Sequence, residues 1–351
     1  MQRLQHGKMV YTQHLANIHR PALCARMRIA LLTHFFPPGH HGGTEMYTCN
    51  LAQGLRRAGH TVSVVCAENW GQGRSCWNGY TDDEYQGVPV HRLYLNWALA
   101  PDVFRYLYDN PLVERHLVEH LSAIGPDLVH ITSCYTLSAS AITAAKALGL
   151  PVVLTLTDSW FICPRHTLLR SDGSLCTGPE GAWGCLRCML WNARAYRWPS
   201  RLLPQGLVAR LLLAVSRRPW LTNLRGLRGM CGDMEARRTF LKRALAQVDV
   251  IISPSQFLKE MFVRNGVAGE RIVVSPHGFD TAWAEGCRQK SPSHILRPGS
   301  GQALRFAYVG AIIPGKGVDV LVRAFGLLDA RSRAEVRIHG DLTQDPLYAT
   351  E

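Results

Sequence analysis

The chain has 351 residues, of which 47% are hydrophobic, and its mean hydropathy is −0.05. These values are typical of a globular protein with room for two domains, and no apolar run is long enough to span a membrane. The 11 cysteines are too few for a small secreted disulfide scaffold. Residues 1–26 have neither periodicity nor an apolar export signal, so we expect a disordered leader, or translation from an upstream start, on a cytoplasmic protein.

The first half of the chain alternates short apolar runs with helical patterns. A first helix is predicted through Tyr47, Leu51 and Leu55 and stops at Gly59, and further helices are predicted over 110–124 and 137–148. Strands are predicted over residues 28–33, 61–66, 88–93, 126–131 and 152–156. This alternation predicts an α/β domain with a doubly wound parallel sheet. Ligands of such sheets bind beyond the carboxyl ends of the strands.

A glycine pair, Gly42 and Gly43, follows the first strand and precedes Glu45 at the start of a helical pattern. Glycines here let a phosphate or a sugar approach the free backbone N–H groups of the helix start. The segment matches neither the dinucleotide fingerprint G-x-G-x-x-G nor a P-loop. The pair therefore indicates a binding turn, although many strand-to-helix turns also use glycine.

Thr157 and Asp158 follow the run Val152–Leu156, which is predicted to be the central buried strand. Their position at the carboxyl end of that strand places them where substrate is expected. A carboxylate there can orient a hydroxyl group or carry a proton. The alternative is that Asp158 caps a turn that follows the strand.

Four cysteines follow with the spacing C-x12-C-x8-C-x2-C, in a loop over residues 163–188 that is rich in glycine and proline. Four thiolates with one C-x-x-C pair can form a tetrahedral structural zinc site and hold together a loop without its own core. Paired disulfides and four unrelated buried thiols are the alternatives. The predicted zinc ligands are Cys163, Cys176, Cys185 and Cys188.

The net charge of +13 is concentrated in one segment. Residues 187–243 contain thirteen arginines and lysines but only two acidic residues, together with tryptophans and a leucine run. This composition suits an anionic membrane surface or a lipid-linked substrate, and a solvated helical surface is the alternative. No nucleic-acid motif is present, so we expect no nucleic-acid partner.

The rest of the chain predicts the end of one domain and the start of another. Strands are expected over residues 248–253 and 271–275, with a helix over 256–264 between them. A linker rich in Ser, Pro and Gly is predicted over 285–303. A second unit then begins with strands over 304–309 and 335–339 around a helix that ends near residue 328. Because this piece is too small to bury a core, we expect the chain to be C-terminally truncated.

Together these segments resemble glycosyltransferase family 4, from Met27 to the last residue. The resemblance depends on the order and spacing of several short motifs, none of which is decisive alone. They are Gly42-Gly43-Thr44-Glu45, Pro126-Asp127-Leu128-Val129-His130, Leu156-Thr157-Asp158 with Trp160, Cys163-Pro164-Arg165, His277-Gly278-Phe279-Asp280, Tyr308-Val309-Gly310 and Lys316-Gly317-Val318.

The resemblance implies a GT-B fold, in which two Rossmann-like domains with parallel sheets face one another. Residues 27–284 would be the acceptor domain, and residues 304–351 would be part of the nucleotide-sugar-binding domain. The implied activity is retaining transfer of a hexosyl-type sugar from a nucleotide-diphosphate sugar, in polysaccharide or lipid-linked glycan synthesis. The acceptor would be a glycan or a lipid-linked molecule, with the enzyme peripheral on the inner face of the cytoplasmic membrane.

The resemblance also assigns roles to residues. Asp158 would be catalytic, orienting hydroxyl groups near the cationic anomeric carbon, and no cofactor would be required for catalysis. The expected substrate-binding residues are Gly42, Gly43, Glu45, Thr157, Gly310, Lys316 and Gly317, with Lys316 on the donor diphosphate. The chain has Ala311 and Thr157 where many members have an arginine and a histidine. A non-catalytic scaffold and a zinc-stabilised nucleic-acid binder are the competing hypotheses.

Overall fold

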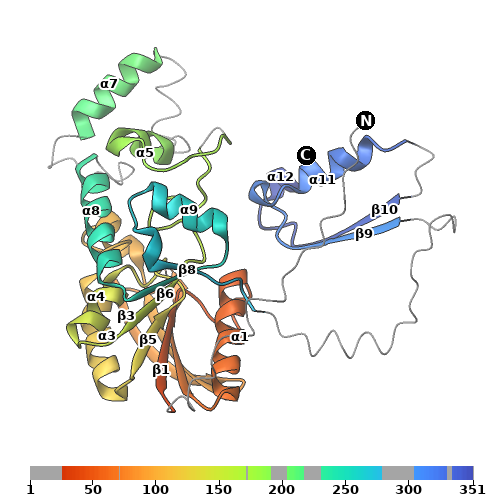
Figure 1. Ribbon diagram of the computed structural model, residues 1–351. Helices are drawn as coiled ribbons and strands as arrows, with labels where there is room; N and C mark the ends of the chain where they lie inside the picture. Colours follow the sequence, from red (N-terminus) through yellow and green to blue (C-terminus); the bar gives the residue numbers. More distant parts are fainter. Residues whose placement is uncertain are drawn as a thin grey trace. The chain divides into compact units, whose positions relative to one another are not determined.

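The computed structural model describes residues 26–70, 72–170, 173–190, 204–216, 231–278, 304–329 and 334–350. The chain divides into two compact units, Met1–Gly278 and Phe279–Glu351, which we describe separately (Figure 1). The predicted linker over 285–303 and all but the last residue of the predicted leader lie outside the described residues. The same holds for much of the basic segment over 187–243.

Unit 1 is built on a sheet that has eight strands among the described residues, in the order β3-β4-β2-β1-β5-β6-β7-β8. The strands are β1 (Arg28–Thr33), β2 (Thr61–Trp70), β3 (Trp77–Tyr85), β4 (Val88–Leu95), β5 (Leu128–Ile131), β6 (Val152–Thr155), β7 (Val250–Ser253) and β8 (Ile272–Val274). Neighbouring strands pair in parallel, except that β3 and β4 are antiparallel. The predicted α/β class with a mainly parallel sheet is confirmed.

The central strands are apolar on both faces because helices cover both. On β1, Leu31 packs in a core with α1, whereas its neighbour Leu32 packs in a core with α3 and α4. Figure 1 shows α1 on one side of the sheet and α3 and α4 on the other. The α-helices of unit 1 are α1 (Gly43–Arg57), α2 (Val103–Tyr106), α3 (Pro111–Ile124), α4 (Ser140–Ala147), α5 (Gly181–Leu190), α7 (Gln205–Ser216), α8 (Cys231–Gln247) and α9 (Gln256–Arg264). Short 3₁₀ turns cover Trp97–Leu99 and Gly269–Arg271.

Helix α3 illustrates how local signals set the helix boundaries. The side chain of Asn110 accepts hydrogen bonds from the N–H groups of Leu112 and Val113 at 3.0 and 3.2 Å. Pro111 occupies the first turn, where its missing N–H costs nothing. The helix ends at Gly125, whose φ of 53° is left-handed and suits glycine. The predicted boundaries of this helix are therefore correct to within a residue.

Strand β3 was not predicted, since its sequence, WNGYTDDEY, is too polar for a buried strand. The strand lies at the edge of the sheet and most of its residues are exposed. An edge strand has one side open to solvent, so charged residues are tolerated there and help prevent association with other sheets. The strands predicted from apolar runs therefore omit this one.

Arg92 on β4 anchors the loop between β1 and α1. Its guanidinium donates to the carbonyl of Pro37 at 2.7 Å and forms ion pairs with Glu68 at 2.8 Å and Asp83 at 2.7 Å. Only 4% of its side chain is exposed, so water cannot replace these partners. The loop carries Phe36, which is fully buried, into the core. This anchoring fixes the chain just before the glycine pair.

We expect Arg92→Met to destabilise unit 1 by about 2 kcal/mol, because Glu68 and Asp83 would lose their shared cation. The value is below that of a fully buried pair because both carboxylates are partly exposed. Urea unfolding followed by tryptophan fluorescence measures the change. The matched control is Arg28→Ala, which removes a pair with Asp127 that is exposed on both sides. Equal midpoints for the two variants would contradict the anchoring role.

Unit 2 contains two parallel strands, β9 (Leu304–Val309) and β10 (Ala334–His339), with helices α11 (Val318–Gly326) and α12 (Pro346–Thr350). A 3₁₀ turn covers Pro314–Lys316. Large apolar side chains remain exposed on β9, α11 and α12, for example Val309 at 80%. Two strands and one longer helix do not bury enough apolar surface to be stable alone. Both units thus contain parallel pairs of strands, as predicted.

Candidate active site

Polar side chains of unit 1 meet at the carboxyl edge of the parallel sheet. The hydroxyl of Thr157, just after β6, donates to the carbonyl of Thr132, just after β5, at 2.9 Å. The Thr132 hydroxyl is 2.7 Å from that of Thr48 on α1. These bonds hold the ends of two neighbouring strands against the first helix. Hydrogen bonds therefore connect these polar side chains at the sheet edge where the order of the strands predicted a ligand site.

Asp158 lies at this edge, in a small cavity that also contains Thr132 and Phe161. Its Oδ1 accepts a hydrogen bond from the backbone N–H of Trp160 at 2.8 Å. Burial raises the pKa of Asp158, and the nearby positive groups, His166 foremost, oppose that rise. The local turn and a chemical role are therefore compatible, because the turn uses only one of the two carboxylate oxygens.

Glu45 and His34 form a second polar pair, which links the first turn of α1 to the end of β1. His34 Nε2 lies 3.2 Å from Glu45 Oε1, and Glu45 is buried. Burial by itself raises the pKa of Glu45, but the hydrogen bond to His34 and its other electrostatic contacts lower it overall. Glu45 is thus a carboxylate at neutral pH, as its predicted binding role requires.

The other ring nitrogen of His34, Nδ1, is buried and has no hydrogen-bond partner among the described residues. A buried polar atom without a partner costs free energy, so such an atom at a ligand edge is a candidate contact for substrate. Sequence reasoning missed His34, although it directly follows a predicted strand. The rule applied to Asp158, that residues after strand ends face the ligand, would have found it.

His166 is a second histidine that sequence reasoning missed. It lies in the turn after Trp160, with a left-handed φ of 52°, and its N–H donates to the Cys163 carbonyl at 2.9 Å. Its ring meets the ring of Tyr135 edge-on at 4.4 Å between centroids. Burial lowers the pKa of His166, while the negative charge of Asp158 raises it. No local pattern predicts this pairing, since it results from the fold of the turn.

Arg237 on α8 contacts the same turn through Trp160. Its guanidinium lies over the Trp160 ring, 5.1 Å from the centroid, and donates to the Trp160 carbonyl. Burial lowers the pKa of Arg237 to about 10, so the group is still a cation at neutral pH. This cation–π contact explains why Trp160 is buried directly after Asp158. Arg237 therefore positions the turn.

The glycine pair begins α1 without a side-chain cap. Gly42 is the N-cap residue, and no side chain accepts the hydrogen bonds of the first N–H groups. A Cβ on Gly42 would lie 2.4 Å from Oε2 of Glu45, whereas a Cβ on Gly43 would meet nothing within 4 Å. Gly42 therefore makes room for Glu45, and Gly43 leaves open space beside the helix start.

His277, the first residue of the predicted motif His277-Gly278-Phe279-Asp280, lies at the end of unit 1. Its ring contacts that of Tyr47 on α1, with centroids 4.1 Å apart. The Tyr47 hydroxyl is in turn 3.4 Å from the hydroxyl of Thr155 on β6. The structure thus connects this motif to the same edge, while Phe279 and Asp280 lie outside the described residues.

In unit 2, the predicted donor-binding residues surround one loop. The N–H of Gly310, after β9, donates to the carbonyl of His339 at 3.0 Å. Lys316 is exposed at the end of the 3₁₀ turn, directly before Gly317. Gly317 has a left-handed φ of 66° and is the N-cap of α11, which explains the need for glycine. The loop therefore presents a lysine beside a helix N-terminus.

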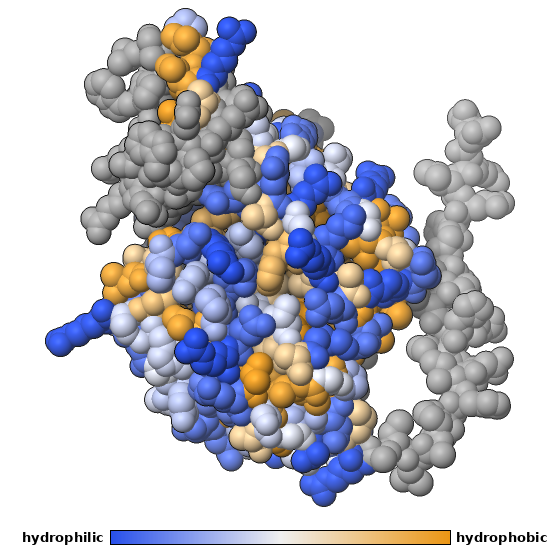
Figure 2. Space-filling view, turned by 90° about the vertical axis from the view of Figure 1, so that its left-hand side faces the viewer, coloured by the Kyte–Doolittle hydropathy of each residue, from blue (hydrophilic) through white to orange (hydrophobic). Residues whose placement is uncertain are grey.

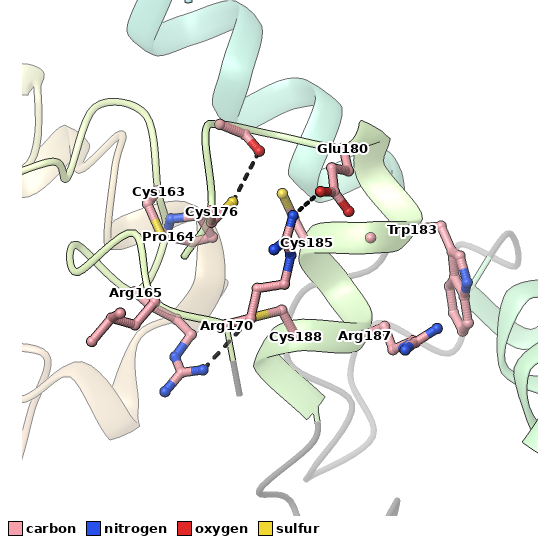
Figure 3. Close-up of a pocket in the computed structure, with 13 residues that line it drawn as sticks. Cys163, Pro164, Arg165, Arg170, Cys176, Glu180, Trp183, Cys185, Arg187 and Cys188 are labelled. Atoms are coloured by element: carbon pink, nitrogen blue, oxygen red, sulfur yellow. Dashed lines mark hydrogen bonds and ion pairs between the residues drawn. The ribbon is translucent and has the colours of Figure 1, made fainter. Parts of the chain in front are cut away.

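The four predicted zinc ligands line one cavity of about 210 Å³. This cavity lies in the loop over 163–188 and on α5, and it does not include Asp158. Burial, together with the neighbouring thiols of Cys163 and Cys176, raises the pKa of Cys185 to about 11. Figure 3 shows all four side chains around the cavity. Within the described part of the chain, no group of three or more His, Cys, Asp or Glu side chains is arranged to hold a metal ion as it stands.

The geometry defines an α/β protein with a polar, partly buried edge on its larger sheet, and part of its sequence matches a known family. Residues 42–205 match the family described as glycosyl transferase 4-like domain. This match agrees with the family that the motifs indicated. A comparison with the curated proteins gives no match.

Several solved structures are similar to the chain. The catalytic domain of starch synthase IV from Arabidopsis thaliana, bound to ADP and acarbose, is 14% identical, with a TM-score of 0.46 over 90% of this chain and 69% of that one. Anabaena HepE in complex with UDP and glucose is 15% identical, with a TM-score of 0.46 over 93% of this chain and 64% of that one. The lipopolysaccharide outer core galactosyltransferase WaaB is 11% identical, with a TM-score of 0.47 over 92% and 64%. The chain thus spans about two thirds of the length of these enzymes.

Proposed function

We propose that the protein is a retaining glycosyltransferase that moves a hexosyl-type sugar from a nucleotide-diphosphate sugar to a hydroxyl group of a glycan or lipid-linked acceptor. The proposal rests chiefly on Asp158, a carboxyl group with a raised pKa at the carboxyl edge of the sheet, within the residues that match the glycosyl transferase 4-like domain. The nucleotides and sugars bound in the similar structures are ligands of those other proteins.

In the proposed reaction, the bond between the anomeric carbon and the diphosphate oxygen breaks, and a bond to the acceptor oxygen forms. The proton of the acceptor hydroxyl passes to the released diphosphate. Positive charge develops on the sugar, so a carboxylate nearby stabilises the transition state. In this scheme Asp158 orients the reacting hydroxyl groups, Thr157 lines the site, and the unpartnered Nδ1 of His34 contacts the sugar.

Unit 2 would hold the donor. Negative charge accumulates on the diphosphate as its bond to the sugar breaks. The Lys316 ammonium and the N–H groups at the start of α11 can offset that charge. Gly310 and Gly317 keep the backbone open for the phosphates.

A donor screen tests the proposal. The protein is incubated with a panel of nucleotide-diphosphate sugars and with acceptor extract, and release of nucleoside diphosphate is measured. We expect one donor class to be consumed in an acceptor-dependent way and the product to keep the anomeric configuration of the donor, as judged by NMR. A folded protein that binds donors without consuming any would support the non-catalytic scaffold, and tighter, salt-dependent binding to DNA or RNA would support the nucleic-acid binder.

The glycine pair gives a prediction for the same assay. We expect Gly43→Ala to lower catalytic efficiency about ten-fold or more without changing the urea midpoint, because the new methyl group occupies only the space left for substrate. Gly42→Ala is the comparison, since its methyl group displaces Glu45 from its contact with His34 and should lower the urea midpoint. Full activity of Gly43→Ala would remove the helix start from the site.

We also propose that the enzyme docks on an anionic membrane, beside a lipid-linked acceptor. On α7, within the basic segment, Leu207 and Leu211 are 47% and 53% exposed, next to the exposed Arg210. Figure 2 shows hydrophobic and hydrophilic residues side by side on this helix, at the top of the view. Exposed leucine next to arginine is typical of a helix that lies in a membrane interface.

Flotation with liposomes tests the docking. We expect binding to anionic vesicles that is released by salt, because such attraction is screened within about 10 Å at 0.1 M ionic strength. Equal binding to neutral and anionic vesicles, or none to either, would contradict it. Among the described residues, no helix is both long enough and apolar enough to cross a bilayer.

A further inference from the structure

The cysteine loop brings four thiols to one place although they are far apart in the sequence. Cys163 lies in the turn after Trp160, Cys176 follows a single β-bridge between Leu169 and Leu175, and the remaining two are one turn apart on α5. All four line the cavity of about 210 Å³, and Figure 3 shows their side chains from opposite walls. The spacing noted in the sequence therefore corresponds to spatial proximity.

This part of the chain has little regular structure to hold it. Between β6 and α5, the described residues form turns and one isolated bridge, and Leu175 is 78% exposed. A loop of this length without strands or helices needs another source of stability, for which disulfides and metal ions are the usual solutions. The thiols are not paired as disulfides in this structure, in which all four cysteines are free.

The charges around the cavity favour a negatively charged cluster. Arg165, Arg170 and Arg187 all line it. Arg165 Nη1 donates to Cys188 Sγ at 3.6 Å. Glu180, the acidic residue among the described lining residues, is paired with Arg170. A zinc ion with four thiolates carries a net charge of about −2, and arginines nearby lower the cost of burying that charge.

We propose that Cys163, Cys176, Cys185 and Cys188 bind one zinc ion that staples this loop. The sulfurs are not yet placed as ligands, since Cys176 Sγ donates to the Gly178 carbonyl at 3.1 Å and Cys188 accepts from Arg165. Zinc binding would require the cysteine side chains to rotate so that the sulfurs lie about 2.3 Å from a common ion, and each ligand thiol would lose its proton.

Backbone hydrogen bonds link the proposed zinc site to the candidate active site. The Cys163 N–H donates to the Ser159 carbonyl at 2.8 Å, and the Cys163 carbonyl accepts from the His166 N–H at 2.9 Å. Ser159 directly follows Asp158, so the first ligand sits in the turn that places both Asp158 and His166. The zinc ion thus holds the shape of that turn without taking part in the reaction.

Elemental analysis of the full chain, purified under reducing conditions, tests the proposal. We expect one zinc ion per chain, and expect its loss in Cys163→Ser and in Cys185→Ser. Cys76→Ser is the matched control, because Cys76 is a half-buried free thiol in unit 1 that lies outside the cluster. Replacement of zinc by Co²⁺ should give the strong thiolate-to-cobalt absorption of a tetrahedral site in the parent chain and in the control.

Two results would overturn the proposal. They are a folded parent chain without stoichiometric zinc after purification under reducing conditions, and a zinc content that is unchanged in both cluster variants. Because these readouts do not depend on catalysis, their failure is distinct from failure of the donor screen. If a serine variant does not fold, the cobalt spectrum of the parent chain still decides the question.

Discussion

Asp158→Asn is expected to lower the rate of glycosyl transfer at least about 100-fold while leaving the fold intact. The asparagine side chain has the same size, and its oxygen can still accept the hydrogen bond from the Trp160 N–H. The turn is therefore retained, and only the carboxyl charge is lost. Steady-state kinetics with the donor identified by the screen gives kcat, and the urea midpoint reports the fold.

The control for this variant is Asp127→Asn. Asp127 is an exposed aspartate just before β5, paired with Arg28 on the surface, so its loss should change neither kcat nor substrate affinity. If Asp158→Asn retained the parent rate, Asp158 would only cap its turn, which is the structural role that the sequence left open.

The second large effect is expected for Lys316→Ala. Loss of a charge-assisted contact to the donor diphosphate costs about 1.5–3 kcal/mol, which corresponds to a drop of roughly 10- to 150-fold in kcat/KM. The loss should appear with every donor of the class, because the contact is to the phosphates and not to the sugar. Kinetics at several donor concentrations separates the effect on kcat from that on KM.

Arg337→Ala is the matched control in unit 2, since it removes an exposed cation from β10 that is paired with Glu335. We expect its kinetics to be unchanged. Equal losses of kcat/KM in the two variants would mean that the overall positive charge of unit 2 matters and not the position of Lys316. An unchanged kcat/KM in Lys316→Ala would remove this residue from the donor site.

Much of the fold could be predicted because the central strands are almost uniformly apolar. Runs such as Arg28–Thr33 and Val152–Thr155 are buried on both faces by helices, which leaves a clear hydrophobic signal. Strand β3 gave no such signal, because an edge strand gains its stability from pairing with β4 rather than from burial. Its antiparallel direction also makes the sheet mixed at that edge.

The candidate site could be predicted only where it follows the order of the strands. Thr157 and Asp158 follow a central strand, and Gly42 and Glu45 follow the first one, so a general rule for parallel sheets places them together. His166 and Arg237 could not be found in this way. Their positions depend on a turn and on a distant helix that meet at Trp160, which is tertiary information.

The spacing of the cysteines predicts which residues lie together but not how their side chains are oriented. Their pattern predicted that four residues across 163–188 act together, and they do share one cavity. Spacing cannot give the rotamers of the thiols, which depend on local partners such as the Gly178 carbonyl and the Arg165 guanidinium.

The most direct test of the central claim is to locate the donor sugar on the protein. A nucleotide-diphosphate sugar with a photoreactive diazirine on the sugar ring is bound to the chain, activated by light and mapped by peptide mass spectrometry. The account predicts labelling of the segments around Gly43 and around Asp158, which is competed by the unmodified donor and reduced in Lys316→Ala. Labelling that avoids both segments, or that the unmodified donor does not compete, would contradict it.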